Sequence, residues 1–243
     1  MNLATITRVF LIIMLTTLAI ACQKQVSVLV ITGGHAFDTI EFLETIGLLN
    51  GVAADPVSHP AAMEILASER VFEYDVLAFY DFIPDMDPTD SSIFLNLCSK
   101  GIPLLFLHHS LCTFQRWDGF MDIVGGHYCM PGFGHDSLLL SDYKHDIELD
   151  IKVSDPNHPV TRGMEDFTIP DEGYSNVSYR QGITPLLETG HPYSSPVVGW
   201  VNEYDHSTIV YLMLGHDRHS YSNDSFQELL TNSIHWLSKN QNH

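Results

Sequence analysis

The chain has 243 residues, with 30 acidic against 11 basic side chains and a formal net charge of −19. This length suits one domain with a well-buried core. The acidic balance excludes nucleic acids and anionic lipid headgroups as expected partners, because both are bound by basic surfaces. A neutral sugar remains compatible with this composition, because acids, histidines and aromatic rings suit ligands rich in hydroxyl groups.

The first segment, residues 1–21, is predicted to be a signal peptide and not part of the fold. Arg8 precedes an apolar run that is too short to span a bilayer comfortably. Small residues before Cys22 resemble a lipoprotein signal, with cleavage before Cys22 and a lipid on its sulfur. An ordinary secretory signal or an uncleaved anchor are the alternatives. We therefore expect a cell-envelope protein held on the membrane at Cys22, with one domain over residues 22–243.

Strands and helices alternate over the first half of this domain. Buried-type strands are predicted at Val26–Ile31, Val52–Val57, Tyr74–Phe79 and Ile102–Leu107, and helices at Asp38–Leu49, Ala61–Arg70 and Asp90–Ser99. This alternation predicts an α/β fold, a mostly parallel sheet with helices on both faces. The carboxyl ends of such strands meet along one edge, where ligands bind.

The second half is less regular. A loop is predicted at residues 132–142, an edge-type strand at Ile147–Val153, an irregular loop at Thr168–Val177, further strands at Thr184–Leu187, Pro196–Val201 and Thr208–Leu214, and a closing amphipathic helix at Ser225–Leu237. No linker separates the two halves, so we expect them to share one core.

Histidines follow three of the predicted strands. His35 follows the first, the doublet His108 and His109 follows the fourth, and His216 follows the last. Imidazole suits proton transfer near neutral pH and also binds zinc or another divalent ion. All four are therefore candidate catalytic residues. We predict that His35, His108 and His216 share one cleft and either bind a divalent metal ion, zinc above all, or transfer protons.

Two adjacent acids, Asp171 and Glu172, lie in a segment bounded by proline and glycine. A solvated turn is the plain interpretation. Near histidines, one acid could instead orient an imidazole, act as a base or bind sugar hydroxyls, so both are candidate catalytic residues. Further candidates for binding substrate lie at strand ends and in aromatic motifs, and they are Gly33, Gly34, Asp81, Trp117 and Tyr174.

Several other functions lack their motifs. The Gly33–Gly34 turn is neither a dinucleotide fingerprint nor a Walker loop, so no nucleotide cofactor is expected. A serine-hydrolase elbow and the CxxC spacing are also absent, so neither a serine hydrolase nor a cysteine-based structural metal site is expected. In an oxidising compartment, Cys112 and Cys129 are the expected disulfide pair. His127 and His135 flank a loop that could fold over the rim, and their role stays open.

Several motifs together resemble the ThuA-like (trehalose utilisation) family, whose fold is similar to the class I glutamine amidotransferase domain. They are TGGHAFD at 32–38, LHHSLCTFQRWDGFMDIVGGHY at 107–128, DPNHPVTRGMEDFTIPDEGY at 155–174 and LGHDRHSY at 214–221. The resemblance implies a flavodoxin-like sheet and a link to carbohydrate use, including oxidised (keto) disaccharides and glycosides.

The resemblance also maps the family's strand-end histidines onto His35, His108 and His216, and its acidic loop onto Asp171 and Glu172. An amidotransferase carries a cysteine nucleophile at the elbow after the fourth strand. This chain has His108 there, so glutamine hydrolysis is not supported.

Two functions follow from these features. The first is a lipid-anchored envelope enzyme, a hydrolase or lyase, acting on a small carbohydrate through a histidine and carboxylate site with or without a metal ion. The second is a non-catalytic carbohydrate-binding lipoprotein that delivers sugar to a transporter or partner enzyme. A scaffold protein in an envelope complex is a weaker third option.

Overall fold

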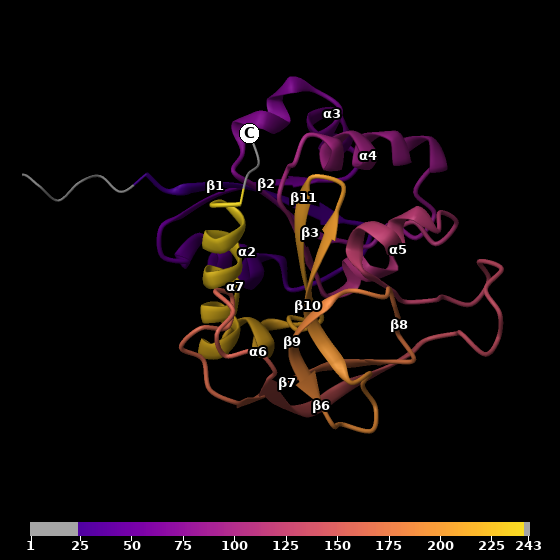
Figure 1. Cartoon of the computed structure of the whole chain (residues 1–243), viewed down its shortest axis with the longest axis vertical. Helices are drawn as coiled ribbons and strands as arrows, with labels where there is room; N and C mark the ends of the chain where they lie inside the picture. Colours follow the sequence, from indigo (N-terminus) through magenta and orange to yellow (C-terminus); the bar gives the residue numbers. More distant parts are fainter. Residues whose placement is uncertain (1–23, 241–243) are drawn as a thin grey trace, which may run out of the picture.

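The computed structural model of the chain describes residues 24–240. The expected signal peptide, residues 1–21, and the expected lipidation site, Cys22, lie outside the described residues. Those residues form a nine-stranded sheet in the order β2–β1–β3–β4–β11–β10–β9–β6–β7, together with a small sheet of β5 and β8 (Figure 1). None of the described helices is long and apolar enough to cross a membrane.

The strands are β1 (Val26–Gly33), β2 (Val52–Ser58), β3 (Val76–Asp81), β4 (Leu104–Leu107), β5 (Gly126–His127), β6 (Asp142–Val153), β7 (Phe167–Ser175), β8 (Ser178–Tyr179), β9 (Thr184–Thr189), β10 (Val197–Tyr204) and β11 (Ser207–Leu212). The α-helices are α2 (Thr39–Leu48), α3 (Ala61–Leu66), α4 (Ser91–Ser99), α5 (Gly119–Val124), α6 (Arg218–Tyr221) and α7 (Asp224–Leu237). Short 3-10 helices are η1 (Glu69–Glu73), η2 (Pro88–Asp90) and η3 (His108–Cys112).

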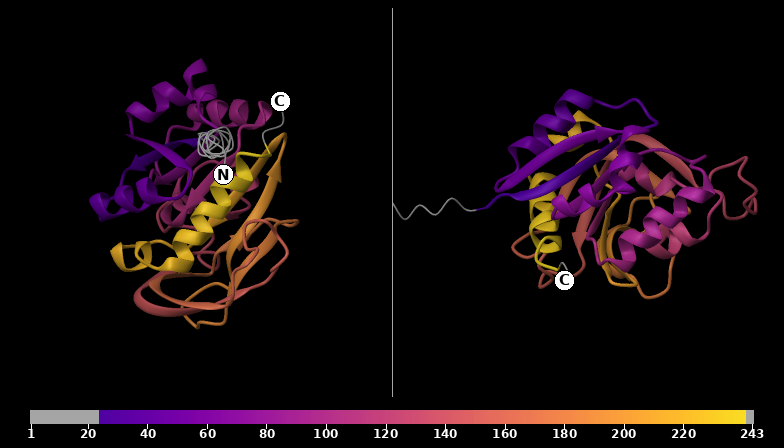
Figure 2. Two further views of the ribbon diagram at one scale, coloured as in Figure 1. Left: turned by 90° about the vertical axis from the view of Figure 1, so that its left-hand side faces the viewer. Right: turned by 90° about the horizontal axis from the view of Figure 1, so that it is seen from above.

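One half of the large sheet is parallel. Strands β2, β1, β3, β4 and β11 all run in the same direction. Both β3 and β11 are buried along their whole length, as expected where helices cover both faces of a sheet. Helices α2 and α7 cover one face, and α4 and α5 cover the other (Figures 1 and 2). The predicted α/β fold is therefore confirmed.

Helix α7 closes the parallel half. The side chain of Asn223 accepts a hydrogen bond from the backbone N–H of Phe226 and so caps the first turn. The apolar residues of α7 recur every three or four positions, which places Phe226, Leu230 and Ile234 on one buried stripe. This stripe packs against β1, β4 and β11, and it fixes the strands whose ends carry the site.

The other half of the sheet is antiparallel and corrects two predictions. Strand β6 is not at the edge, because it pairs with β9 on one side and with β7 on the other. The predicted irregular loop at Thr168–Val177 is the edge strand β7. Pro170 does not prevent this, since an edge strand tolerates a residue that cannot donate a backbone hydrogen bond on its open side.

The predicted disulfide is also wrong. Cys98, Cys112 and Cys129 are all free and buried. Burial raises the pKa of the Cys112 thiol well above its usual value, so this thiol is protonated and unsuited to nucleophilic attack.

Candidate functional site

A cavity of about 290 Å³ opens at the carboxyl end of the parallel strands. Its volume lies just below the roughly 300–1,000 Å³ typical of small-molecule sites, so it suits a small ligand. The residues that line it follow β1, β3, β4 and β11 or belong to β6, β7 and the segment after β5, and they are His35, Phe82, His108, His109, Cys112, Tyr128, Met130, Tyr143, His145, Glu172, Tyr174 and His216.

His108 stands at a sharp bend where β4 ends and η3 begins. Its φ angle is 47°, in the left-handed region that costs a non-glycine residue about 1–3 kcal/mol. Two contacts hold the bend. The Tyr211 hydroxyl donates to the His108 carbonyl oxygen at 2.9 Å, and the His108 Nδ1 atom lies 2.6 Å from the Met213 carbonyl oxygen. Because a carbonyl only accepts, His108 Nδ1 carries the proton.

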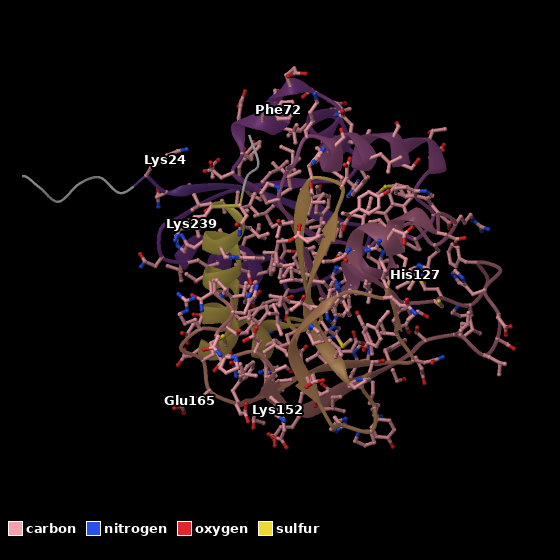
Figure 3. All side chains as sticks on the ribbon, viewed as in Figure 1. Lys24, Phe72, His127, Lys152, Glu165 and Lys239 are labelled. Carbon is pink, nitrogen blue, oxygen red and sulfur yellow. The ribbon has the colours of Figure 1, made fainter. Side chains whose placement is uncertain are left out.

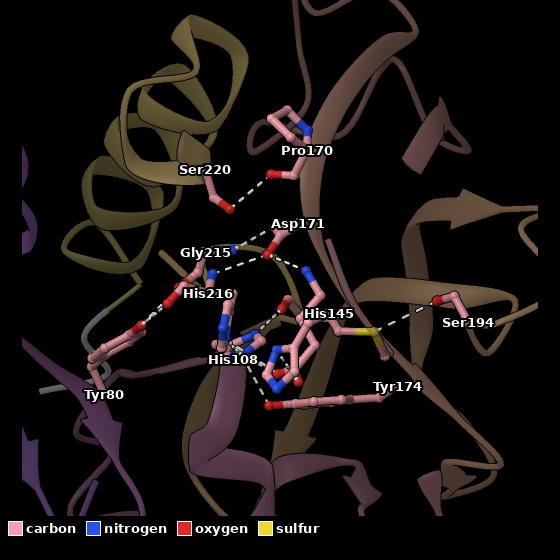
Figure 4. A network of polar contacts seen from close by, with 12 residues as sticks. Tyr80, His108, His145, Pro170, Asp171, Tyr174, Ser194, Gly215, His216 and Ser220 are labelled. Atoms are coloured by element: carbon pink, nitrogen blue, oxygen red, sulfur yellow. Dashed lines mark hydrogen bonds and ion pairs between the residues drawn. The ribbon is translucent and has the colours of Figure 1, made fainter. Parts of the chain in front are cut away.

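The Nε2 atom of His108 faces two further ligand-type atoms from distant parts of the chain. It lies 3.0 Å from Glu172 Oε2 and 3.1 Å from His216 Nδ1, and the last two atoms are 3.3 Å apart (Figure 4). We call these three residues the His108 triangle. In a tetrahedral zinc site, metal–ligand bonds of about 2.0–2.1 Å place neighbouring nitrogen or oxygen ligands about 3.3 Å apart. The His108 triangle therefore has the dimensions and the donor set of a divalent metal site.

Glu172 is the charged centre of this arrangement. Burial would raise the pKa of its carboxyl, but hydrogen bonds with His108 and His216 bring that pKa well below the ordinary value. In turn, burial would lower the pKa of His216, and the bond with Glu172 raises it. The second carboxylate oxygen, Oε1, lies 3.0 Å from Nδ1 of His145, which is half exposed at the mouth of the cavity. Glu172 is thus an ionised carboxylate shared by three imidazoles.

Asp171 supports the His108 triangle through hydrogen bonds to its backbone. Its buried carboxylate accepts hydrogen bonds from the backbone N–H groups of Gly215 at 2.8 Å, of His216 at 3.0 Å and of Glu172 at 2.8 Å (Figure 4). The cavity lining does not include Asp171. It fixes the backbone that carries two of the three triangle residues, so it is a positioning residue.

His109 turns away from the triangle into the cavity wall. Its ring packs against Tyr80 and His35, with ring centroids 4.3 and 5.3 Å away. Burial, helped by nearby His108 and His35, holds the pKa of His109 well below its usual value, so the ring is neutral. Among the described residues its buried Nε2 atom has no hydrogen-bond partner, although the ring lines the cavity.

Of the three histidines predicted to share one metal ion, the structure brings two together. His108 and His216 belong to the triangle, whereas His35 lines the mouth of the cavity beside His109 and Phe82. Glu172 takes the third position. The reason is topological. The strand β11 lies between β4 and the antiparallel strands and brings His216 next to β7, while His35 follows β1, on the other side of β3.

Of the predicted substrate-binding residues, only Tyr174 lines the cavity. Its hydroxyl lies 3.0 Å from His108 Nε2. The Asp81 carboxylate is buried and bonds His59 Nε2 at 2.9 Å, and Trp117 packs against the Phe114 ring.

The glycine turn after β1 also lies outside the lining and has a structural reason. Gly34 has a φ of 81°, and a Cβ atom there would lie only 1.9 Å from the Phe82 carbonyl oxygen. Gly33 has a φ of 121°, which other residues rarely adopt. The two glycines therefore make a tight turn that presents His35.

Sequence reasoning missed His145. The register between β6 and β7 shifts between Lys144 and Ile147, and Asp146 has a φ of 55°. This β-bulge redirects the strand where His145 meets Glu172. Tyr143, Tyr128 and Met130 were missed for a similar reason, because a regular strand pattern or a loop gives no sign of which side chains enter a cavity. The only available signal was a histidine in the polar residues between the predicted loop at 132–142 and the predicted strand at Ile147–Val153.

Solved structures with this fold come from several organisms. A putative ThuA-like protein from Parabacteroides merdae superposes with a TM-score of 0.72 at 16% identity, over 88% of this chain and 90% of that one. A putative ThuA-like protein from Bacteroides uniformis gives 0.65 at 16% identity, over 87% and 91%. A β-galactosidase from Bacillus circulans gives 0.56 at 11% identity, over 86% of this chain but 30% of that one. At these identities the likeness concerns the fold alone.

Sequence comparisons are more specific. No curated protein sequence gives a significant match. The family model described as "ThuA: Trehalose utilisation" matches residues 27–237, nearly all of the described chain and every residue of the cavity. The chain therefore belongs to the ThuA (trehalose utilisation) family.

Proposed function

We propose that this protein is an envelope enzyme that binds a small carbohydrate with a keto or glycosidic group, and that the His108 triangle acts on it with a bound divalent metal ion. One observation carries the proposal. His108 donates a hydrogen bond from Nδ1–H to the Met213 carbonyl oxygen, so Nε2 is the ring nitrogen that can bind an ion, and it faces the Glu172 carboxylate and His216 Nδ1. Two imidazole nitrogens and a carboxylate oxygen that converge in a buried place suit a bound cation.

The kind of metal ion is inferred from the ligand atoms of the His108 triangle. Two imidazole nitrogens and one carboxylate oxygen are the ligand set of many catalytic zinc sites, in which a fourth position stays open to water or substrate. The hydrogen bond from His108 Nδ1 to the Met213 carbonyl oxygen orients the ring, as such bonds commonly do for metal-binding histidines. Zinc bound there would supply Lewis acidity, which polarises a carbonyl or lowers the pKa of a bound water.

Residues of the chain itself would transfer protons and bind the sugar. His145 is half exposed, touches the free oxygen of Glu172 and stands at the cavity mouth, so it can exchange a proton between substrate and solvent. The Tyr174 hydroxyl, at the base of the cavity, can donate to a developing negative charge. Phe82 and Tyr143 add ring faces to the lining, and such faces suit the apolar side of a sugar.

The test combines metal analysis with turnover. The purified full chain is expected to hold zinc and to convert members of a panel of keto-sugars and glycosides. Glu172→Gln and His216→Ala should lose metal and activity together. A protein without metal and without turnover on the panel would contradict the proposal. Sugar binding without turnover, with affinity retained in His108→Ala, would instead support the non-catalytic carbohydrate-binding lipoprotein.

The envelope location is part of the proposal and has its own test. Residues 1–21 as a signal peptide and a lipid on Cys22 predict that the full chain fractionates with membranes. Cys22→Ser should shift the protein to the soluble envelope fraction, whereas Cys98→Ser should not. Membrane association that survives Cys22→Ser would contradict the lipid anchor and leave the proposal for the cavity untouched.

A further inference from the structure

A second group of metal-ligating side chains lies beside the cavity and outside the His108 triangle. His127, Cys129 and His135 each offer one ligand atom, and these three atoms lie within 4.8 Å of one another. We propose that this group, the Cys129 cluster, binds a second metal ion of the zinc class, which holds the segment from Cys129 to Ser141 against the body of the protein.

The geometry of the cluster fits such an ion. The Cys129 Sγ and His127 Nδ1 atoms are 3.7 Å apart. Bonds of about 2.3 Å to sulfur and 2.0–2.1 Å to nitrogen, at a tetrahedral angle, place the two ligands about 3.6 Å apart. His135 joins from the far side of the segment, with its ring centroid 5.2 Å from that of His127. His127 and Cys129 are buried, and His135 is partly buried.

Gln115 orients both imidazoles from the body of the protein. Its Oε1 atom lies 2.9 Å from His135 Nε2, and its amide nitrogen lies 3.1 Å from His127 Nε2. Gln115 itself is buried and anchored to the backbone of Tyr128 and Met130. The Gln115 amide oxygen accepts from His135 Nε2–H, which leaves Nδ1 of His135 free for an ion. In His127 the amide nitrogen of Gln115 donates to Nε2, so an ion that binds Nδ1 beside Cys129 Sγ displaces the proton there. The His135–Gln115 bond is the kind that commonly orients a metal-binding histidine.

The cluster connects the body of the protein to a projecting segment. His127 lies beside α5, on the side from which this segment extends (Figures 1 and 3). The base of the segment is closed by hydrogen bonds between Cys129 and Ser141, one from each backbone N–H. His135 lies midway along it, and an ion would bind the segment to His127 there. Because Tyr128 and Met130 line the cavity, the ion would also steady one wall of the site.

Sequence spacing gave no sign of this site. It contains one cysteine, and its ligands follow His-x-Cys-x5-His, which departs from the CxxC pairs typical of structural zinc. The mixed sulfur and nitrogen donors separate it from the His108 triangle, whose donors are nitrogen and oxygen. A probe that reports on thiolate ligation therefore distinguishes the two sites.

Cobalt(II) is that probe, because a thiolate bound to cobalt gives a near-ultraviolet charge-transfer band. The full chain, stripped of metal and titrated with cobalt(II), is expected to show the band and to bind two equivalents. Cys129→Ser and His135→Ala should abolish the band and remove one equivalent. Glu172→Gln should keep the band, and Cys98→Ala is the matched control for a buried cysteine. Gln115→Leu should weaken cobalt and zinc binding at the cluster by about 10–100-fold, as loss of an outer residue does in other metal sites.

The opposite results would overturn the inference. They are a wild-type protein with no charge-transfer band, a band that survives Cys129→Ser, or a band lost in Cys98→Ala. His135→Ala guards against misfolding, because this residue is only partly buried and lies in a loop. Limited proteolysis gives a second measure, in which metal removal should increase cleavage between residues 131 and 139 in the wild type but not in His135→Ala. Equal cleavage with and without metal would also count against the site.

Discussion

The Nε2 atom of His108 lies 3.0 Å from the Oε2 atom of Glu172, in a ring whose Nδ1 proton already goes to a backbone carbonyl. Two lone pairs at this distance repel each other in a buried place, so a proton or a metal ion must lie between them. His216 Nδ1, 3.1 Å from the same nitrogen, adds a third. The His108 triangle is therefore a binding site for positive charge. Its residues come from the end of β4, from β7 and from the segment after β11.

Replacing Glu172 by glutamine tests this relationship directly. The amide retains the shape of the carboxylate but removes the negative charge and offers N–H groups to the two imidazoles. We expect zinc affinity at the triangle to fall by more than about 100-fold, because even outer residues of metal sites are worth 10–100-fold. Competition with a zinc-binding dye measures the change. Glu148→Gln, an exposed substitution on β6, is the control, and equal affinities in both variants would contradict the assignment.

The metal-free protein should lose stability as the pH rises through neutrality. Burial lowers the pKa of His216, yet the bond with Glu172 more than offsets this and raises it above 6.5. A raised pKa means that the folded state binds the proton more tightly, so this contribution is complete below 6.5 and is lost as the pH passes the raised value. The pKa of Glu172 is lowered, so the stability that its carboxylate contributes is complete above pH 4.5. It is lost only as the pH falls into the strongly acidic range.

Urea unfolding of the metal-free chain between about pH 6 and pH 9 measures this effect. Glu172→Gln has lost the partner that raises the pKa of His216, so the difference in unfolding free energy between wild type and variant should shrink with increasing pH. Two curves that stay parallel over this range would show that the His216–Glu172 pair does not govern the stability of the site.

His145 should affect turnover without affecting metal content. It touches Glu172 Oε1, which is not the triangle oxygen, and it is half exposed at the mouth. His145→Ala is expected to lower kcat by about 10²–10⁴-fold, the usual contribution of a general acid or base. His219→Ala, which removes an exposed histidine on α6, is the control. If His145→Ala keeps full activity, or loses its zinc, the proton-transfer role is wrong.

The parallel half of the fold follows from sequence patterns, because strands alternate with helices and because β1, β4 and β11 are largely apolar runs followed by glycine or histidine. The position of His108, His109 and His216 at one edge of the sheet follows from the parallel direction of β4 and β11. Two features were beyond such patterns. Pro170, Asp171 and Gly173 break the apolar alternation of β7, and this strand forms because β6 pairs with it and because Gly215 and His216 satisfy the Asp171 carboxylate. His145 depends on a bulge, a register shift that no local pattern encodes.

Asp171 holds the backbone of the His108 triangle in place. Replacing it should lower the free energy of unfolding more than replacing a surface acid does. Asp171→Ala would leave the buried N–H groups of Gly215, His216 and Glu172 without an acceptor, and each unsatisfied group costs about 1–3 kcal/mol. We expect the free energy of unfolding to fall by at least about 3 kcal/mol, and Asp171→Asn, which keeps one oxygen, to lose less. Asp150→Ala removes a carboxylate that bonds the exposed Thr168 hydroxyl and should change stability by about 0.5 kcal/mol or less. Equal losses in the Asp171 and Asp150 variants would mean that Asp171 does not hold the backbone of the triangle in place.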